Sequence, residues 1–440
     1  MLVPLRVKKF LFLKTLSKLP IRKLHVSFLP MKFFVLPRSI FSVFLFVAIQ
    51  TFFGVAPGSA YVGIVSSPVT GLMNPTDPLN SNDDFFLYFE GPDHGLYKIA
   101  CDNGELNPLR WDKVNDRTAT VATRLGGIDV VTYSSPCVLH DYKNPNSWEN
   151  ATQGHIFFRG AGNELYRMNL DGTGLLDLAV QTLSTPCAIW EAVYKNGAST
   201  PLSESVYFQG LNNELFKVNS DGTGLIDLGV QTFSPPCAVN VKDVKVQSAT
   251  TEIFYQGAGN ELNKLDVLKF SREPTHCVTF LNNYIASTPA LEYSVPASNA
   301  GVDAGTWEFN ILFQSTENEF CKVDPNGNNP TTHTNQVILS SPCARSQWLQ
   351  SGALYQGCIF QGGNNNLITQ FSDSYPSDDS FAGGDFEGSD YQTKSTPCSI
   401  IRHEACSWVF YPVYRDRMYI CCQNSDDRLE VFFKDIDPSL

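Results

Sequence analysis

The sequence contains none of the short motifs that mark common enzyme active sites. It has no His-Glu-x-x-His, no Gly-x-Ser-x-Gly and no phosphate-binding glycine loop. Its seven histidines occur at no repeated position, so a ring of metal ligands is not expected. We predict neither a catalytic residue nor a cofactor. Carboxylates such as Asp129, Asp303 and Glu308 leave a glycosidase or lyase with an axial site open as the less favoured alternative.

Acidic residues are absent from the first 60 positions, which carry nine lysines and arginines. Residues 31–60 combine a basic start, an apolar run from Ile40 to Val55 and small residues before Ala60. This pattern predicts a secretory signal peptide, with a membrane anchor as the alternative. Residues 1–30 are interpreted as a basic leader or a start-site artefact. We therefore expect a secreted protein with no stable membrane insertion after signal cleavage.

The rest of the chain is strongly acidic. The whole sequence has a net charge of −12, and subtracting the nine positive charges leaves −21 for residues 61–440. Such a surface repels phosphate backbones, so a nucleic-acid partner is not expected. All 12 cysteines follow residue 60, where an oxidising compartment favours disulfides. Asn150 begins a glycosylation sequon that a eukaryotic host would use.

A Ser/Thr-Pro step occurs seven times and divides residues 61–440 into units of about 50 residues. The intervals between its prolines are 68, 50, 50, 53, 53 and 55 residues. The prolines are Pro68, Pro136, Pro186, Pro236, Pro289, Pro342 and Pro397.

Each unit continues with an aromatic-rich run, such as "IFFRG" from Ile156 or "VYFQG" from Val206. A Gly- and Asn-rich turn follows, then a further strand and a second hairpin signal, "DGTG" at 171–174 and 221–224. No segment of residues 61–440 shows sustained helical periodicity. Four short antiparallel strands in every unit predict an all-β fold, a seven-bladed β-propeller forming a single domain over 61–440.

The two ends of the repeat array complement each other. The last unit stops at Leu440 after three strands, whereas Tyr61–Val65 directly precedes the first Ser/Thr-Pro step, where a fourth strand belongs. We expect this N-terminal strand to complete the last blade and close the ring.

The phrase "SSP…IFFRGAGNELYRMN" resembles the repeats of seven-bladed propeller lectins of the bacterial fucose-binding kind. The resemblance covers residues 61–440 and implies this fold and a carbohydrate ligand. Tryptophan usually follows the recurring leucine in those lectins, whereas this chain has Tyr97, Tyr166, Phe216, Asn263, Cys321, Ile368 and Glu430. "LYRMNLDGTG" from Leu165 also resembles the propeller of low-density-lipoprotein-receptor-related proteins, although their Tyr-Trp-Thr-Asp phrase is absent.

One polar residue ends the aromatic run of every unit, and it is usually glutamine. Either this side chain caps a backbone group between blades, or it forms a hydrogen-bonding floor for a sugar between blades. The residues are Glu90, Arg159, Gln209, Gln256, Gln314, Gln361 and Gln423, of which Arg159 and the four glutamines from Gln209 to Gln361 are the ligand-binding candidates.

Tryptophans near the first hairpin of several units are candidates for stacking on a sugar, although core packing is the alternative. The stacking candidates are Trp190, Trp348 and Trp408.

Cysteine follows the proline in five units, while Val69 and Ala290 take this place in the other two, so the position is a small buried site. Some of these cysteines can also pair. We expect Cys343 to face Cys358 across a hairpin and Cys398 to reach Cys421 in the same way.

These observations favour a non-enzymatic, lectin-like protein with repeated sites between its blades, whose partners are glycans or glycoproteins. An extracellular protein–protein interaction scaffold that uses one face of the ring is the first alternative, since one fold hosts many functions.

Overall fold

The computed structural model describes residues 64–72, 85–101, 122–140, 154–195, 198–243, 248–268, 276–294, 308–348, 354–374, 387–408, 411–427 and 429–436. All of them belong to the second of two compact units, Gly58–Leu440, the first being Met1–Pro57. The regular elements in the described ranges are all β-strands, and none of those ranges contains a helix long and apolar enough to cross a membrane.

The strands form six four-stranded antiparallel sheets and one three-stranded sheet. Sheet 1 holds β1 (Val69–Leu72), β2 (Phe85–Glu90), β3 (Leu96–Cys101) and β4 (Thr123–Arg124); sheet 2 holds β5 (Cys137–His140), β6 (Gly154–Arg159), β7 (Glu164–Asn169) and β8 (Leu176–Gln181). Sheet 3 holds β9 (Cys187–Lys195), β10 (Ala198–Gln209), β11 (Glu214–Asn219) and β12 (Ile226–Gln231); sheet 4 holds β13 (Cys237–Asp243), β14 (Ser248–Gln256), β15 (Glu261–Leu268) and β16 (His276–Tyr284).

The remaining sheets continue the same order. Sheet 5 holds β17 (Ala290–Ser294), β18 (Glu308–Gln314), β19 (Glu319–Val323) and β20 (Thr331–Val337); sheet 6 holds β21 (Cys343–Trp348), β22 (Leu354–Gln361), β23 (Asn366–Ser374) and β24 (Glu387–Gln392). Sheet 7 holds β25 (Cys398–Trp408), β26 (Tyr411–Gln423) and β27 (Leu429–Ile436).

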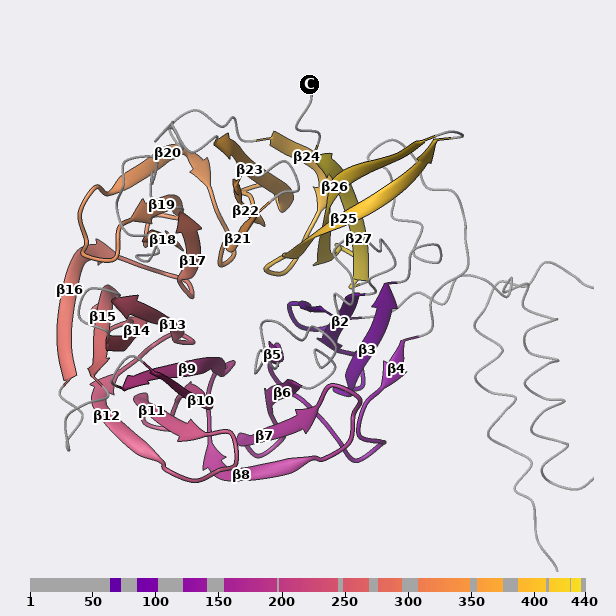
Figure 1. Ribbon diagram of the computed structural model, residues 1–440. Coiled ribbons are helices and arrows are strands. Elements are labelled where there is room, and N and C mark those ends of the chain that lie inside the picture. The colour runs from indigo at the N-terminus through magenta and orange to yellow at the C-terminus, as the bar shows by residue number, and fades with distance from the viewer. Residues whose placement is uncertain are drawn as a thin grey trace, which may run out of the picture. The chain divides into compact units, whose positions relative to one another are not determined.

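The sheets follow one another around a central axis, with the first strand of each sheet innermost (Figure 1). The predicted all-β propeller is therefore confirmed. The expected four strands per blade are present in six sheets, and the described part of the seventh has three.

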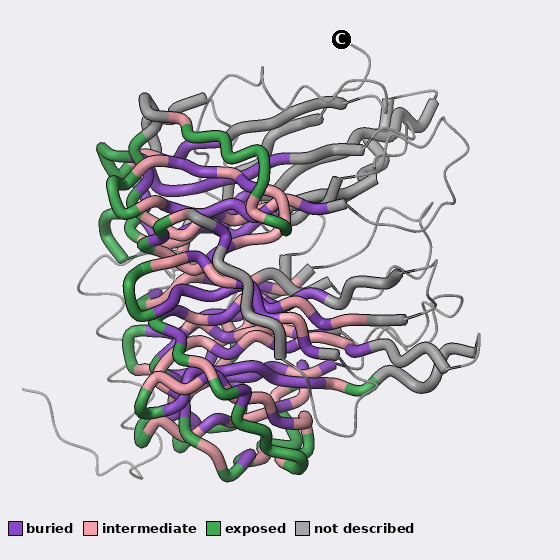
Figure 2. Tube along the Cα trace, turned by 90° about the vertical axis from the view of Figure 1, so that its left-hand side faces the viewer, coloured by how far each residue is buried: buried purple, intermediate pink, exposed green. Residues whose placement is uncertain are grey.

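The second strand of each sheet lies between two neighbouring sheets, which explains its apolar sequence. Ile156, Phe157 and Phe158 of β6 are all buried, because both faces of the strand are covered. The outermost strand β8 buries only Leu178 and alternates with exposed residues, because its other side meets water. Buried strands therefore lie within the stack of sheets, and exposed segments gather at its margins (Figure 2).

Apolar clusters join each pair of neighbouring sheets rather than filling one central core. Tyr88 of sheet 1 packs with Ile156 and Phe158 of sheet 2. Phe157 on the opposite face of β6 packs with Phe208 of sheet 3. Each sheet is thus stabilised mainly by its neighbours, as in other repeat proteins.

Candidate functional site

The connections between sheets share one sequence pattern, a buried Thr or Ile, then a variable residue, then Ser. The N–H of the Thr or Ile donates to the carbonyl of a turn residue with positive φ, at 2.6–2.8 Å. The donor–acceptor pairs are Thr132 with His94, Thr182 with Asn163, Thr232 with Asn213, Ile285 with Asn260, Ile338 with Asn318, Thr393 with Asn365 and Ile64 with Asp427. We number each such junction by the sheet that carries the turn.

The serine of this pattern fixes the next sheet. Ser134 Oγ accepts the N–H of Arg159 at 3.2 Å, and Ser340 Oγ accepts that of Gln361 at 3.1 Å. The variable residue also bonds forward, since the N–H of Phe233 donates to the carbonyl of Gln256 at 2.8 Å. The Ser/Thr-Pro step is therefore a structural link between neighbouring sheets.

The glutamines that end the second strands hold these junctions together. Gln209 Nε2 donates to Asn213 Oδ1 and to the carbonyl of Thr232, both at 2.8 Å. Gln256, Gln314 and Gln361 make the same two bonds, and Gln423 makes them to Asp427 Oδ1 and the carbonyl of Ile64. Both amide protons are engaged inside the protein, so only Oε1 is left to meet a ligand.

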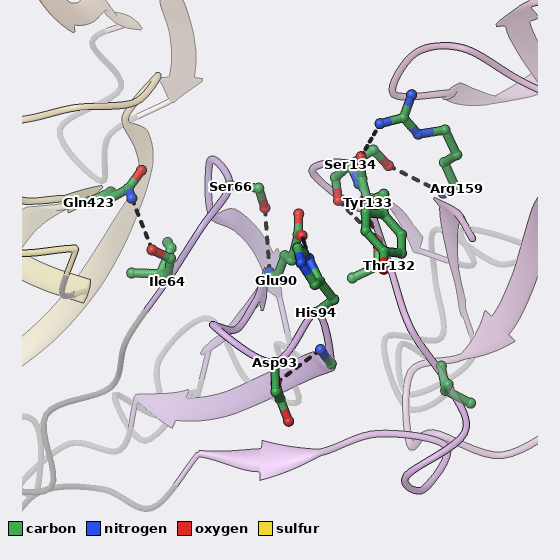
Figure 3. Close-up of polar contacts among 12 residues, drawn as sticks. Ile64, Ser66, Glu90, Asp93, His94, Thr132, Tyr133, Ser134, Arg159 and Gln423 are labelled. Carbon is green, nitrogen blue, oxygen red and sulfur yellow. Dashed lines mark hydrogen bonds and ion pairs between the residues drawn. The ribbon is translucent and has the colours of Figure 1, made fainter. Parts of the chain in front are cut away.

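Three junctions depart from the neutral glutamine–asparagine pair: the second has Arg159, the seventh has Asp427, and the first has both residues replaced. Glu90 stands in place of glutamine and His94 in place of asparagine, and His94 Nδ1 lies 2.6 Å from Glu90 Oε1 (Figure 3). The Glu90 side chain is almost fully buried. Burial raises the pKa of this carboxyl, while the hydrogen bond and charge of His94 and the charge of Arg159 oppose the rise.

Tyr133, the variable residue of this connection, covers the pair. Its ring stacks on His94 with 4.3 Å between ring centroids and 22° between planes, and the residue is 39% exposed. An aromatic face is thus held at the surface beside a buried carboxylate.

Arg159 of the neighbouring sheet completes the first junction. Its guanidinium donates to the carbonyls of Leu183, at 2.5 Å, and Tyr133. Arg159 therefore connects two successive inter-sheet connections, and its positive charge acts on Glu90. We call Glu90, His94, Tyr133 and Arg159 the first-junction site.

Of the predicted tryptophans, only Trp190 has a described side chain, and it lies outside this site. Trp190 on β9 packs against the apolar cluster that contains Val206 and Phe208. Trp348 and Trp408 end β21 and β25, and their side chains lie outside the described residues. Asn150 and Asp303 are also outside the described residues, so glycosylation and a role for Asp303 stay predictions.

In three blades, the aromatic residue after the recurring leucine packs closely against the strand-end glycine. A Cβ on Gly91, Gly160 or Gly210 would lie 2.5 Å from the ring of the following Tyr97, Tyr166 or Phe216. These three rings are therefore part of the blade itself.

Neither predicted disulfide is formed in the structure. Cys343 opposes Ile359, and Cys358 opposes Ala344, so the offset of one residue sends the two side chains to opposite faces of the sheet. Cys398 does oppose Cys421, but both are thiols within an apolar cluster. Opposed Cβ atoms in a regular ladder stand about 4.5–5.5 Å apart, and a disulfide needs about 3.5–4.5 Å.

The cysteines after the prolines meet along the innermost strands. Cys137 Sγ accepts the N–H of Ala188, and Cys187 Sγ accepts that of Ala238, both at 3.3 Å. Burial raises the pKa of Cys137 to about 12 and that of Cys187 to about 11. These thiols are space-filling groups that resist ionisation.

A buried ion pair occupies the contact between sheets 3 and 4. Glu191 accepts from Lys217 Nζ at 2.8 Å, from the Tyr207 hydroxyl and from Thr251 Oγ1 at 3.2 Å. Its carboxylate is fully engaged and 3% exposed, so it is not a general acid or base. No group of three or more His, Cys, Asp or Glu side chains arranged for a metal ion occurs in the described part of the chain.

No protein family model matches the sequence, and no curated protein matches it. Among solved structures, a complex of Aleuria aurantia lectin with α-methyl-L-fucoside is 12% identical, with a TM-score of 0.43, over 74% of this chain and 96% of that one. AofleA from Arthrobotrys oligospora is 12% identical, with a TM-score of 0.43, over 74% of this chain and 87% of that one. BBS1N in complex with ARL6DN is 12% identical, with a TM-score of 0.46, over 88% of this chain and 95% of that one. Fucose-specific propeller lectins are thus among the structures similar to this chain, as the sequence resemblance implies.

Proposed function

We propose that the protein is a secreted, non-enzymatic carbohydrate-binding propeller whose ligand binds at the first-junction site. One observation carries the proposal: the exposed ring of Tyr133 stacks on His94, which contacts the Glu90 carboxylate, and the Arg159 guanidinium donates to the Tyr133 carbonyl. Sugars present an apolar C–H face that packs on such a ring, and neighbouring hydroxyls that bond to charged acceptors and donors. Glycans and glycoproteins are the partners this chemistry fits.

The hydrogen-bonding capacity of the site supports this proposal. Arg159 has five N–H donors, and carbonyl groups engage one on each terminal nitrogen. Glu90 offers a second carboxylate oxygen besides the one that contacts His94. A diol above Tyr133 would therefore find both a donor and an acceptor.

Equivalent sites at the other junctions would have to use the glutamine Oε1 atoms. The Nε2 protons of Gln209, Gln256, Gln314 and Gln361 are already engaged within the protein, so these side chains have no N–H left to donate to a sugar. We therefore place the main site at the first junction and expect any repeated sites to be weaker.

We also propose that the N-terminal segment completes sheet 7 as a seventh blade. The Ile64 N–H bonds to the Asp427 carbonyl at 2.8 Å, and Gln423 Nε2 bonds to the Ile64 carbonyl at 2.9 Å. Ile64 also packs with Cys398 and Cys421. These contacts repeat those of the other junctions with residues from opposite ends of the chain, and Tyr61–Gly63 lie outside the described residues.

A glycan array followed by calorimetry on the best ligand tests the carbohydrate proposal. We expect one dominant site, and Tyr133→Ala should weaken binding about tenfold because the stacking face is lost. Phe233→Ala is the matched control, since Phe233 occupies the same position at the third junction and is similarly exposed. Absence of binding to every glycan, or an equal effect of the two substitutions, would refute the proposal.

A further inference from the structure

The variable residue of each connection is fixed by its backbone, and in every connection except the second, where Leu183 is half-buried, it is exposed. At the third junction the Thr232 carbonyl accepts from Gln209, and the Phe233 N–H donates to the next sheet. Thr232 and Ser234 on either side are buried, whereas Phe233 is 42% exposed. This side chain therefore has no packing role that demands an apolar residue.

Large apolar side chains nevertheless gather at these positions and beside them. Phe233, Leu339, Leu211, Tyr284 and Val337 are all between 41% and 56% exposed. Gln231, two residues before Phe233, donates to the Asn212 carbonyl in the turn that contains Leu211. Val337 lies close to the turn of the next sheet, since a Cβ on Gly363 would lie 3.0 Å from it. The five residues, which we call the connector patch, lie at the third, fourth and fifth junctions, on the side of the sheets that carries the turns.

Carboxylates border the connector patch. Tyr284 is the register partner of Glu261, Val337 is that of Glu319, and Gln231 is that of Glu214. Glu317 lies exposed in the turn before Glu319. The described turns 210–213, 257–260, 315–318 and 362–365 and the connections 232–234, 285–287 and 338–340 contain no lysine or arginine.

We infer that the connector patch docks a partner polypeptide segment in which lysines or arginines alternate with large apolar side chains. Exposed apolar groups on a rigid backbone are typical of protein interaction surfaces, and the acidic border selects a basic partner. Backbone bonds on both sides of Phe233 and Leu339 hold these two anchors in place before binding, which lowers the entropic cost of association. This surface is separate from the first-junction site.

Labelled peptides of alternating Lys and Leu, Glu and Leu, and Lys and Ser test the inference by fluorescence anisotropy. Only the Lys/Leu peptide should bind, and its affinity should fall several-fold between about 50 and 300 mM salt because the border charges are screened. Phe233→Ser with Leu339→Ser should weaken binding at least about tenfold through loss of two apolar anchors. Glu261→Gln with Glu319→Gln should weaken it less and flatten the salt dependence.

Leu225→Ser is the matched control, because Leu225 is 51% exposed but precedes the outer strand β12, away from the patch. It should leave binding unchanged, and circular dichroism should show every variant folded. The inference is overturned if the three peptides bind alike, if none binds at about 1 mM, or if the Phe233/Leu339 variant binds as well as the control. Self-association that the same variant abolishes, seen by analytical ultracentrifugation, would overturn it in favour of a second copy of this chain.

Discussion

Sheets 2 and 3 have different residues, alanine and glycine, at one equivalent position with a left-handed backbone. The effect of this difference can be measured as a change in the free energy of unfolding. Ala179 on β8 has a φ of 57°, and Gly229 on β12 has a φ of 70°. Each donates its N–H to the aspartate two residues earlier, Asp177 or Asp227, at 2.8 Å. The register of both strands shifts at this level, so each turn is a β-bulge that requires the left-handed conformation.

Left-handed backbone costs a residue with a Cβ about 1–2 kcal/mol, and glycine loses about 0.4–1 kcal/mol more unfolded-state entropy than alanine. Ala179→Gly should therefore stabilise the protein by about 0.5–1 kcal/mol. Gly229→Ala should destabilise it by a similar amount, with no steric contribution, because a Cβ there would meet nothing within 4 Å.

Urea denaturation of the two variants and the parent compares their free energies of unfolding. The change is read from the shift in the urea midpoint, provided that the dependence of the free energy on urea concentration stays the same. Ala161→Gly is the control, since Ala161 is an exposed turn residue without positive φ and should only lose stability. If Ala179→Gly destabilised the protein as Ala161→Gly does, the strain argument would be refuted.

Three other predictions concern the first junction, the inner thiols and the N-terminal segment. The pKa of Glu90 is raised in the folded state, so the stability that this group contributes is fully present below its unfolded pKa near 4.5 and is lost as pH rises through its folded pKa. The free energy of unfolding should therefore fall over this pH range in the parent protein, and Glu90→Gln should remove that fall. Cys137 and Cys187 should escape iodoacetamide at pH 8 in the native protein and react in urea, as peptide mass mapping would show, and rapid native labelling would contradict their raised pKa values. Ile64→Ala should cost about 2–4 kcal/mol in urea unfolding, and Val65→Ala, at an exposed position, less than about 0.5 kcal/mol; equal small effects would count against ring closure.

Hairpin register explains why some details could be read from the sequence and others could not. The strands and their order follow from periodicity, because the repeated turns place them within a residue or two. Cys398 and Cys421 were predicted to oppose each other, and their register is confirmed. Cys343 and Cys358 miss by one residue, because nothing in the sequence fixes the length of the turn between their strands, and one residue changes the face.

The first-junction site was only partly visible in the sequence. Glu90 stands out from the glutamine series, but its relation to His94 depends on the left-handed turn that brings the two side chains together. Tyr133 belongs to a position that varies freely between repeats, so the pattern gave no reason to single it out. A local turn joins Glu90 to His94, whereas contacts between distant segments bring in Tyr133 and Arg159.

Of the seven junctions, the first is the one at which both the glutamine and the asparagine are replaced, and this is the physical reason to look for function there. A glutamine–asparagine pair satisfies a junction without charge, and an ionised Glu90 lacks the protons that Gln209 donates to both Asn213 and Thr232. Such a replacement gives up about 1–3 kcal/mol of hydrogen bonding and desolvation, which suits a position kept for binding.

The first-junction site can be transplanted to the third junction, where Phe233 already supplies the aromatic ring. Gln209→Glu, Asn213→His and Gln256→Arg would reproduce the first junction around it. We expect the triple variant to lose about 1–3 kcal/mol of stability, because it gives up the glutamine bonds. It should also gain a second binding site for whichever glycan the parent binds, seen by calorimetry as a stoichiometry that rises from one to two. A folded variant that still binds one equivalent would show that these four groups are insufficient and that the ligand depends on features the first junction does not share with the third.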